Sequence, residues 1–382
     1  MRVALVHDWL TGMRGGEKVL EEVCLLFPEA PLFTLVHVPG SVSGVIEART
    51  IRTSPLSRWP GVARSYRRFL PLFPHLVEGF DLRGFDLVVS TSHCVAKGAK
   101  APPGAVHVSY VFSPMRYVWD RWDDYFGPGR SDPLTRAAMR ALRGPLQAWD
   151  RRSAARVDRF LCDSAFVAER IRRYWSRGAE VIPPPADTDV FSPTGEARSG
   201  EWLVVAALVA YKRVDLAIRA AEAAGVPLVV VGTGPDEARL RAAASSRVRF
   251  AGWASEAELV SYYSRARGLL FPGVEDFGIV PLEAMACGCP VVAYAEGGAL
   301  ETVRGAAWDG DPSGAPREAT GLFVREQTVE AFARAILAVE EDRARIDPAA
   351  CRSRALEFAR PAFRRRLAAA LTGAGAGPIL PN

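Results

Sequence analysis

Long apolar runs are missing from this chain of 382 residues. No uncharged stretch reaches the ~18 residues that a membrane-spanning helix needs. The opening MRVALVHD is a short apolar run interrupted by charge, which is not the pattern of a signal peptide. We therefore expect a cytoplasmic protein, and peripheral attachment to the inner face of the membrane stays open as an alternative.

Cysteine is scarce, and its spacing argues against a zinc site. The six cysteines are scattered through apolar contexts. Cys287 and Cys289 lack the second pair of ligands that zinc would need nearby. The pattern indicates reduced cysteines in a protein core rather than a disulfide framework.

Acidic residues are outnumbered only in the first half. Residues 1–180 hold 26 Lys and Arg against 18 Asp and Glu, whereas the remainder holds 22 against 25. This balance favours an anionic acceptor or an anionic membrane surface, and a solvated surface in an arginine-rich chain is the alternative. Nucleic acid is not expected as a partner, because the basic residues are not interleaved with aromatics in any recognisable binding module.

The most informative stretch runs from Leu269 to Thr302, LLFPGVEDFGIVPLEAMACGCPVVAYAEGGALET. An apolar strand leads into a loop that carries Glu275, and an apolar helix starts near Ile279 after Gly278. The pattern predicts one strand–loop–helix–strand unit of a parallel α/β sheet.

The chemistry of this stretch lies at the loop. A glycine before a helix start exposes backbone N–H groups and the positive end of the helix dipole, which attract phosphate or polyol oxygens. Glu283 lies about one turn into the helix, on the same side as Glu275. Carboxylates beside an anion site are costly unless hydroxyls donate hydrogen bonds to them, and a sugar nucleotide supplies both groups. Two solvated glutamates on an ordinary helix are the alternative.

The run EDFGIVPLEAMACGCPVVA resembles the E-x7-E signature of retaining, family 4 type glycosyltransferases of the GT-B fold. The resemblance is specific from Lys212 to Glu301 and looser before residue 180. It implies an α/β protein of two Rossmann-like domains that face each other across a cleft. We expect an N-terminal acceptor-side domain at residues 1–185 and a C-terminal nucleotide-sugar donor domain at 186–353. A last helix at 354–372 would pack back on the first domain.

The resemblance assigns the donor mainly to the second half. Lys212 matches the lysine that binds the diphosphate. The family commonly has an arginine five residues earlier, where this chain has Ala207, so Arg213 or an arginine of the first half would have to replace it. The other donor-binding candidates are Glu283, Phe277, Gly278, Ile279, Val280, Gly234, Gly252 and Trp253.

Gly15 and Gly16 are the donor-binding candidates of the first half. They follow a strand predicted at residues 3–6 and precede a helix predicted at 18–26, an arrangement that brings backbone N–H groups close to a phosphate. In the resembled family the equivalent loop faces the donor diphosphate.

Polar residues just past two other strands, His93 and Arg116, are candidates for the acceptor or sugar pocket, although a structural role for His93 stays open. Phe112 stands where the family usually has a histidine that contacts the outer hydroxyl of the donor hexose. A phenyl ring packs against a methyl group but forms no such hydrogen bond. We therefore predict a donor without a 6-hydroxyl, a 6-deoxyhexose or a pentose, with mannose or glucose types as the alternative.

The implied reaction is transfer of a sugar from a nucleotide diphosphate sugar, with retention at the anomeric carbon, to a glycan, lipid-linked or small-molecule hydroxyl. The catalytic candidates are Glu275, Lys212 and Gly16. No metal or other cofactor is expected, because the lysine and the helix ends would supply positive charge. A nucleotide-sugar epimerase and a non-catalytic binding partner are the alternatives. A nicotinamide dehydrogenase is disfavoured, because no strand is followed by G-x-G-x-x-G with an acidic residue beyond it.

Residues 64–80, RSYRRFLPLFPHLVEGF, combine arginines with aromatic and aliphatic residues. This composition fits a segment that lies in a membrane interface. Two prolines interrupt any long helix, so a loop that packs on the core is the alternative.

Overall fold

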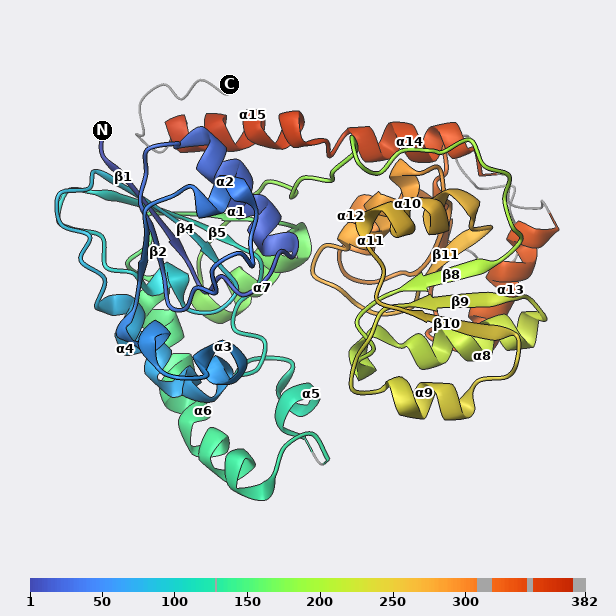
Figure 1. Cartoon of the computed structure of the whole chain (residues 1–382), viewed down its shortest axis with the longest axis horizontal. Helices are drawn as coiled ribbons and strands as arrows, with labels where there is room; N and C mark the ends of the chain where they lie inside the picture. Colours follow the sequence, from blue (N-terminus) through green and yellow to red (C-terminus); the bar gives the residue numbers. More distant parts are fainter. Residues whose placement is uncertain (128, 308–317, 342–345, 374–382) are drawn as a thin grey trace. The chain divides into compact units, whose positions relative to one another are not determined.

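The computed structural model describes residues 1–127, 129–307, 318–341 and 346–373, which form two units. The first unit comprises Met1–Pro185 and the chain from Pro361 onward, and the second comprises Ala186–Arg360. Each unit is a parallel sheet with helices on both faces (Figure 1).

The first unit contains a sheet of seven strands within the described residues, in the order β3-β2-β1-β4-β5-β6-β7. The strands are β1 (Val3–His7), β2 (Leu32–Thr34), β3 (Ile51–Thr53), β4 (Leu87–Ser92), β5 (Val106–Val111), β6 (Arg159–Cys162) and β7 (Glu180–Val181). The helices are α1 (Gly15–Leu26), α2 (Gly44–Glu47), α3 (Val62–Ser65), α4 (Phe73–Glu78), α5 (Trp122–Phe126), α6 (Pro133–Ala154), α7 (Ala165–Trp175) and α15 (Arg360–Leu371), with 3-10 turns η1 (Pro55–Arg58), η2 (Tyr66–Leu72) and η3 (Ala96–Gly98).

Alternating apolar residues explain why this sheet is covered on both faces. Leu5 and Val89 point to a core shared with α1 and α15. Ala4 and Val88 point to the opposite core, which α3, η2, α4 and α6 complete. The last helix therefore belongs to the packing of the first unit.

The second unit repeats the architecture, with strand order β10-β9-β8-β11-β12-β14-β13 within the described residues. The strands are β8 (Trp202–Val205), β9 (Leu228–Val231), β10 (Val248–Gly252), β11 (Gly268–Phe271), β12 (Val291–Tyr294), β13 (Gly305–Ala307) and β14 (Gly321–Val324). The helices are α8 (Val214–Ala224), α9 (Glu237–Ala243), α10 (Glu256–Arg265), α11 (Ile279–Ala286), α12 (Ala299–Thr302), α13 (Val329–Glu340) and α14 (Pro348–Leu356), with the 3-10 turn η4 (Ala210–Lys212).

Two cores sandwich the second sheet as well. Leu203 and Leu269 pack toward α10, α11 and α14 on one face. Val204 and Leu270 pack toward α8 and α13 on the other (Figure 1).

The predicted last helix at 354–372 is two helices. Helix α14 ends at Leu356 and α15 begins at Arg360, directly before Pro361. The break has a physical reason, because a residue before proline avoids the helical conformation and proline suits a first helical turn. Cys351 of α14 lies in the core of the second unit, and Phe363 of α15 lies in the core of the first.

Residues 64–80 form the end of α3, then η2 and α4, and much of their apolar surface is buried. Tyr66, Leu70, Phe73 and Val77 all belong to a core of the first unit. The core-packing alternative therefore holds for these four residues. Within the described ranges, none of the helices combines the length and hydropathy of a bilayer-spanning segment.

Candidate functional site

Both sheets have a switch point, where strand order reverses and ligands of α/β folds bind at the carboxyl ends of the strands. In the first unit it lies between β1 and β4, and in the second between β8 and β11. Most of the polar residues singled out in the sequence follow these strands. The two clusters are described separately below.

Lys212 and Glu275 meet at the switch point of the second unit. Lys212 ends the turn η4 after β8, and Glu275 lies in the loop after β11. Lys212 Nζ forms an ion pair with a carboxylate oxygen of Glu275, and the two side chains are 15% and 19% exposed. The predicted catalytic lysine and glutamate are therefore adjacent, and both are accessible to a ligand.

Glycines bring these loops together. A Cβ on Gly273 would lie 2.9 Å from Lys212 Cα, and one on Gly298 would lie 2.2 Å from Phe277 Cα. The Gly298 N–H donates to the Glu275 carbonyl at 2.9 Å. Only residues without a side chain allow such close backbone packing, so the loop that carries Glu275 is held from both sides.

Helix α11 begins directly after this loop, with Gly278 as its N-cap at φ 91°. Glu283, one turn into the helix, is buried and accepts a hydrogen bond from the Tyr263 hydroxyl at 3.2 Å. Burial and the nearby carboxylate raise the pKa of Tyr263 well above its ordinary value, so the hydroxyl stays a donor. Glu283 thus has a protein partner, and its predicted hydrogen bonds to a ribose remain a prediction.

The apolar candidates beside the loop, Phe277, Ile279 and Val280, are buried or partly buried. Phe277 is 5% exposed, and its ring centroid lies 5.9 Å from that of Phe358. Ile279 and Val280 are partly buried against the same core.

Ala207 is exposed at the end of β8, where the resembled family has an arginine. Arg213, the predicted replacement in the second unit, follows Lys212 directly and stays a prediction. Its Nη1 donates to Gln327 Oε1 at 2.7 Å, and its Nε lies 3.4 Å from Asp215 Oδ1. The guanidinium of Arg213 thus contacts two side chains of the same unit.

Gly234 lies in the loop after β9, the neighbour of β8, and Gly252 is the last residue of β10, which pairs with β9 on its other side. The Gly232 N–H donates to the Gly252 carbonyl at 2.7 Å, which joins the two loops. Trp253 follows directly and is 75% exposed. An exposed indole beside backbone polar groups is suited to stack on a nucleobase.

In the first unit, Gly15 and Gly16 are the first two residues of α1, which starts three residues earlier than predicted. A Cβ on Gly16 would lie 3.3 Å from the Phe112 ring. The structure therefore places the predicted glycine and the predicted phenylalanine in contact.

Asp8, which the sequence reasoning missed, organises the loop after β4. Its buried carboxylate accepts backbone hydrogen bonds from residues 93, 94, 95 and 96 at 2.7–2.9 Å. It also lies 3.1 Å from His93 Nδ1. The His93 ring stands edge-on to Trp9 at 4.4 Å and lies 6.5 Å from the Phe112 ring.

His7 and Glu17 form a second pair beside it, which was also missed. His7 Nδ1 lies 2.7 Å from Thr91 Oγ1, and its Nε2 lies 3.7 Å from Glu17 Oε1. Burial raises the pKa of Glu17, but the hydrogen bond and charge of His7 outweigh it and leave this pKa below its ordinary value. The signal was a His-Asp pair directly after a buried strand, where α/β folds place ligand-binding groups.

Arg116 lies on the loop after β5 and contacts Ser113 Oγ through Nε at 3.4 Å. Ser113 Oγ also accepts from the buried Arg170, whose guanidinium pairs with Asp120 at 2.7 Å. This network ties the loop to α7.

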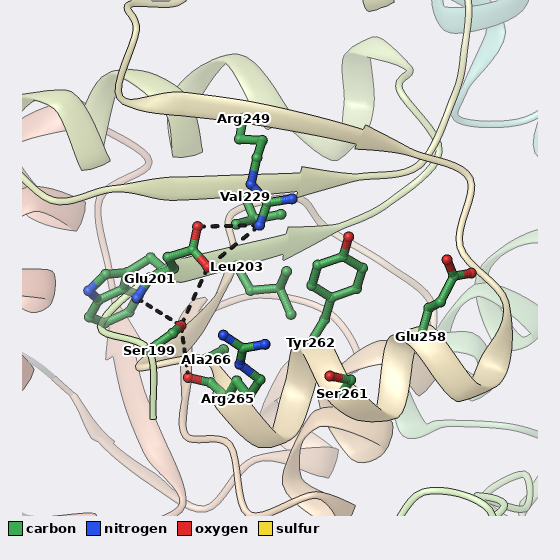
Figure 2. A pocket seen from close by; sticks show the side chains of 11 residues that line it. Ser199, Glu201, Leu203, Val229, Arg249, Glu258, Ser261, Tyr262, Arg265 and Ala266 are labelled. Carbon is green, nitrogen blue, oxygen red and sulfur yellow. Dashed lines mark hydrogen bonds and ion pairs between the residues drawn. The ribbon is translucent and has the colours of Figure 1, made fainter. Parts of the chain in front are cut away.

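A pocket of about 310 Å³ lies elsewhere in the second unit, between α10 and the amino-terminal parts of β8–β10 (Figure 2). Charged side chains that line it already contact other side chains. Arg249 pairs with Glu201 at 3.3 Å, and Glu258 accepts a hydrogen bond from Ser255 at the start of α10. It contains none of the predicted site residues.

Among the residues that the structure describes, no group of three or more His, Cys, Asp or Glu could hold a metal ion. All six cysteines are buried and unpaired with one another, as predicted. Burial raises the pKa of Cys287 and Cys289 to about 12, so both are thiols at neutral pH.

Residues 193–358 match the family model described as glycosyl transferases group 1. The matched range lies within the second unit and covers less than half of the chain. The match contains Lys212, Glu275 and Glu283, so the resemblance stated from these residues is confirmed.

Curated relatives of this glycosyltransferase family support the assignment. The chain is 33% identical over 196 residues to a GDP-mannose-dependent alpha-(1-6)-phosphatidylinositol monomannoside mannosyltransferase of Mycobacterium tuberculosis. The match covers 43% of this chain and 48% of that protein. A D-inositol 3-phosphate glycosyltransferase of Kineococcus radiotolerans is 39% identical over 26% of this chain and 22% of its own length. The chain thus matches about half, or less, of the relatives' length.

Solved structures show the fold over the full chain. A sucrose-phosphate synthase from Thermosynechococcus elongatus matches with a TM-score of 0.70 and 19% identity, over 98% of this chain and 100% of its own. Anabaena HepE in complex with UDP-glucose matches with a TM-score of 0.65 and 16% identity, over 98% and 100%. The predicted α/β class with two Rossmann-like domains of the GT-B fold is confirmed.

Proposed function

We propose that this protein is a retaining, metal-independent glycosyltransferase that uses a nucleotide diphosphate sugar. The observation that carries the proposal is the pairing of Lys212 with Glu275 beside the first turn of α11. A lysine can bind the donor diphosphate, and a carboxylate can accept hydrogen bonds from the sugar hydroxyls. The named activities of the relatives, GDP-mannose-dependent mannosyl transfer and inositol phosphate glycosylation, fit this assignment.

Each group of the donor has a place in the second unit. Lys212 and the α11 amides take the diphosphate and stabilise the charge that develops as it leaves. Glu275 positions the hexose and Glu283 holds the ribose. The Gly234 and Gly252 loops bind the base edge, and Trp253 stacks on the base.

The first unit supplies the acceptor side. His93 and the other switch-point residues line the acceptor pocket, and the amides at Gly15 and Gly16 are suited to bind phosphate oxygens. Arg116 adds positive charge for an anionic acceptor. Attack on the same face as the departing diphosphate gives retention, and no metal or other cofactor takes part.

The donor sugar lacks a 6-hydroxyl in this proposal. A Cβ on Gly16 would lie 3.3 Å from the Phe112 ring, and a phenyl ring has no polar group to bond the outer hydroxyl. A methyl group or a bare ring edge fits such a phenyl surface.

A contact with anionic lipid is a further part of the proposal. Residues 49–77 contain six arginines and no acidic residue. Trp59 and Leu72 are 62% and 53% exposed beside arginines 58, 64, 67 and 68, which are exposed as well. Basic residues around exposed apolar side chains suit a peripheral location at the inner face of the membrane. Sedimentation with phosphatidylcholine vesicles should require added phosphatidylglycerol and should be lost in Trp59→Ala/Leu72→Ala.

The function is tested with matched donors. GDP-mannose and GDP-rhamnose differ only at position 6, and UDP-glucose and UDP-xylose differ by the whole C6 group. We expect thermal stabilisation by one nucleotide family and transfer to octyl α-mannoside with the anomeric configuration retained. Equal kcat/KM for both members of each pair would refute the donor proposal, and an inverted product would refute retention.

Two other activities would give different products. An epimerase of the same fold would convert the nucleotide sugar without any acceptor. A non-catalytic partner would bind the donor panel without turnover. Product analysis with and without acceptor separates all three.

A further inference from the structure

We propose that the pocket beside α10 in the second unit binds a small phosphorylated polyol, such as a hexose phosphate. The pocket lies between α10 and the amino-terminal parts of β8–β10 (Figure 2). Lys212 and Glu275 follow the carboxyl ends of β8 and β11, at the opposite edge of the same sheet. The inference therefore concerns a second binding site and goes beyond the proposed transferase function.

The size and lining of the pocket suit a small ligand. Three of its lining residues, Leu203, Val229 and Ala266, are apolar and almost fully buried, and most of the others are polar. Ligand pockets combine apolar surface with a few placed polar groups and usually hold about 300 Å³ or more. This pocket holds about 310 Å³, which suits a monosaccharide better than a nucleotide sugar.

Arg265 provides positive charge for the phosphate. In Figure 2 its side chain points from α10 toward the strands. Within the described residues, its guanidinium pairs only with Glu196, whose carboxylate oxygen lies 4.0 Å from Nε. Both Nη groups can therefore donate to a ligand, and the planar fork of a guanidinium matches phosphate oxygens.

Arg249 lines the same pocket as a second cation. Its guanidinium carbon lies 5.8 Å from the centre of the Tyr262 ring, and its Nη2 lies 3.3 Å from Glu201 Oε1. Hydrogen bonding to Tyr262 and Glu201 raises the pKa of Arg249 above its ordinary value. Two arginines on one pocket favour a phosphate over a carboxylate, because a phosphate has more acceptor oxygens and more charge.

The other polar groups of the pocket suit the hydroxyls of a polyol. Glu258 Oε2 accepts hydrogen bonds from the Ser255 N–H and hydroxyl, each at 2.7 Å, whereas Oε1 has no such partner within the described ranges. These hydrogen bonds hold the pKa of Glu258 below its ordinary value, so it is a charged acceptor at neutral pH. Ser199 and Ser261 add hydroxyls, and the Tyr262 ring offers a flat surface to the C–H face of a sugar. We infer that the arginines bind the phosphate and Glu258 binds the polyol.

Isothermal titration calorimetry on the full chain tests the site. The probes are glucose 6-phosphate, mannose 6-phosphate and glycerol 3-phosphate, with glucose and orthophosphate as comparisons. Saturating GDP or UDP is present, and the titrations are repeated in Lys212→Met, so that the diphosphate-binding site does not account for the heat. At least one phosphorylated polyol should bind with a Kd of about 1 mM or lower, and glucose and orthophosphate should each bind at least about 10-fold more weakly.

Two variants and a matched control locate the binding. Arg265→Met should weaken binding of the phosphorylated polyol by about 10-fold or more, because its charged hydrogen bonds are lost. Ser261→Phe should abolish binding, because the ring fills the pocket. Arg241→Met removes the same charge from an ion pair with Glu237 on α9, outside the pocket, and should bind as wild type does. All three positions lie on helices and are not buried, so the melting temperatures should stay near that of wild type.

The proposal is overturned if none of the three phosphorylated polyols binds at about 10 mM, or if binding survives both Arg265→Met and Ser261→Phe. Orthophosphate that binds as tightly as the polyol phosphates would also overturn it, because the pocket would then be a site for free phosphate. The proposed function fails separately. In that case the wild-type protein shows no stabilisation by nucleotides and forms no glycoside, whatever the pocket binds.

Discussion

Replacing Lys212 by Met and Glu275 by Gln, one at a time, should separate donor binding from turnover. The two side chains form an ion pair and are 15% and 19% exposed. A diphosphate must compete with Glu275 for the ammonium group. Removing the lysine therefore weakens diphosphate binding, whereas removing the carboxylate charge leaves the lysine free for it.

The magnitudes follow from these contacts. A hydrogen bond to a charged group contributes about 1.5–3 kcal/mol, so Lys212→Met should weaken binding of GDP or UDP by about 10- to 150-fold. A partly exposed ion pair contributes at most about 1 kcal/mol, so Glu275→Gln should strengthen binding by up to about fivefold. Its kcat should nevertheless fall at least about tenfold, because the sugar loses its charged hydrogen-bond acceptor.

Isothermal titration calorimetry with GDP and UDP measures the change in nucleotide affinity. Initial rates at saturating donor measure the change in kcat. Lys100→Met is the matched control, since it removes the same charge from an exposed pair with Glu78 in the first unit. Its nucleotide affinity should equal that of wild type. Unchanged affinity in Lys212→Met, or full turnover in Glu275→Gln, would refute the assignment of this site.

Three further changes test other parts of the structure. Phe112→His should raise kcat/KM for GDP-mannose relative to GDP-rhamnose by about 3- to 10-fold, the contribution of one hydrogen bond, and an unchanged ratio would contradict the donor proposal. Gly298→Ala should lower the free energy of unfolding by about 1–3 kcal/mol, because its Cβ would lie 2.2 Å from Phe277 Cα, whereas Gly144→Ala, with open space around its Cβ, should not lower it. Burial lowers the pKa of His107 to about 4, so the folded state disfavours the charged ring. The free energy of unfolding should be highest above pH ~6.5 and should fall by about 3 kcal/mol as the pH drops to 4. Urea titrations of a His107→Gln variant should show a smaller fall in this free energy.

The second unit was the easier one to predict from the sequence. Glu275, Gly278 and the start of α11 are separated by few residues, so their proximity is visible in the chain itself. The contact of Lys212 with Glu275 spans more of the chain, and there the family resemblance supplied the link. What no local pattern reveals is that Gly298 packs against Phe277, because that contact depends on the order of β11 and β12 in the sheet.

The first unit was harder because its important contacts join distant residues. Asp8 binds the backbone of residues 93–96, and nothing in either segment alone identifies the other. Helix α6 was also missed, although Asp132 caps it by accepting from the Thr135 N–H at 2.9 Å and Pro133 begins it. An aspartate followed by proline is a helix-start signal, but Pro145 inside the helix argues against a long helix.

The two departures from the family pattern can be understood from what surrounds them. Ala207 lies exposed just after β8, and the nearest arginine in sequence, Arg213, has Gln327 and Asp215 as partners. Phe112 replaces an expected histidine, but its ring lies 6.5 Å from that of His93, which is already oriented by a carboxylate. The first unit therefore still has a histidine side chain near this position, but it lies after β4 rather than after the neighbouring strand β5. If the proposed function is right, these departures should change which sugar is recognised, and the pair of Lys212 and Glu275 should still bind the donor.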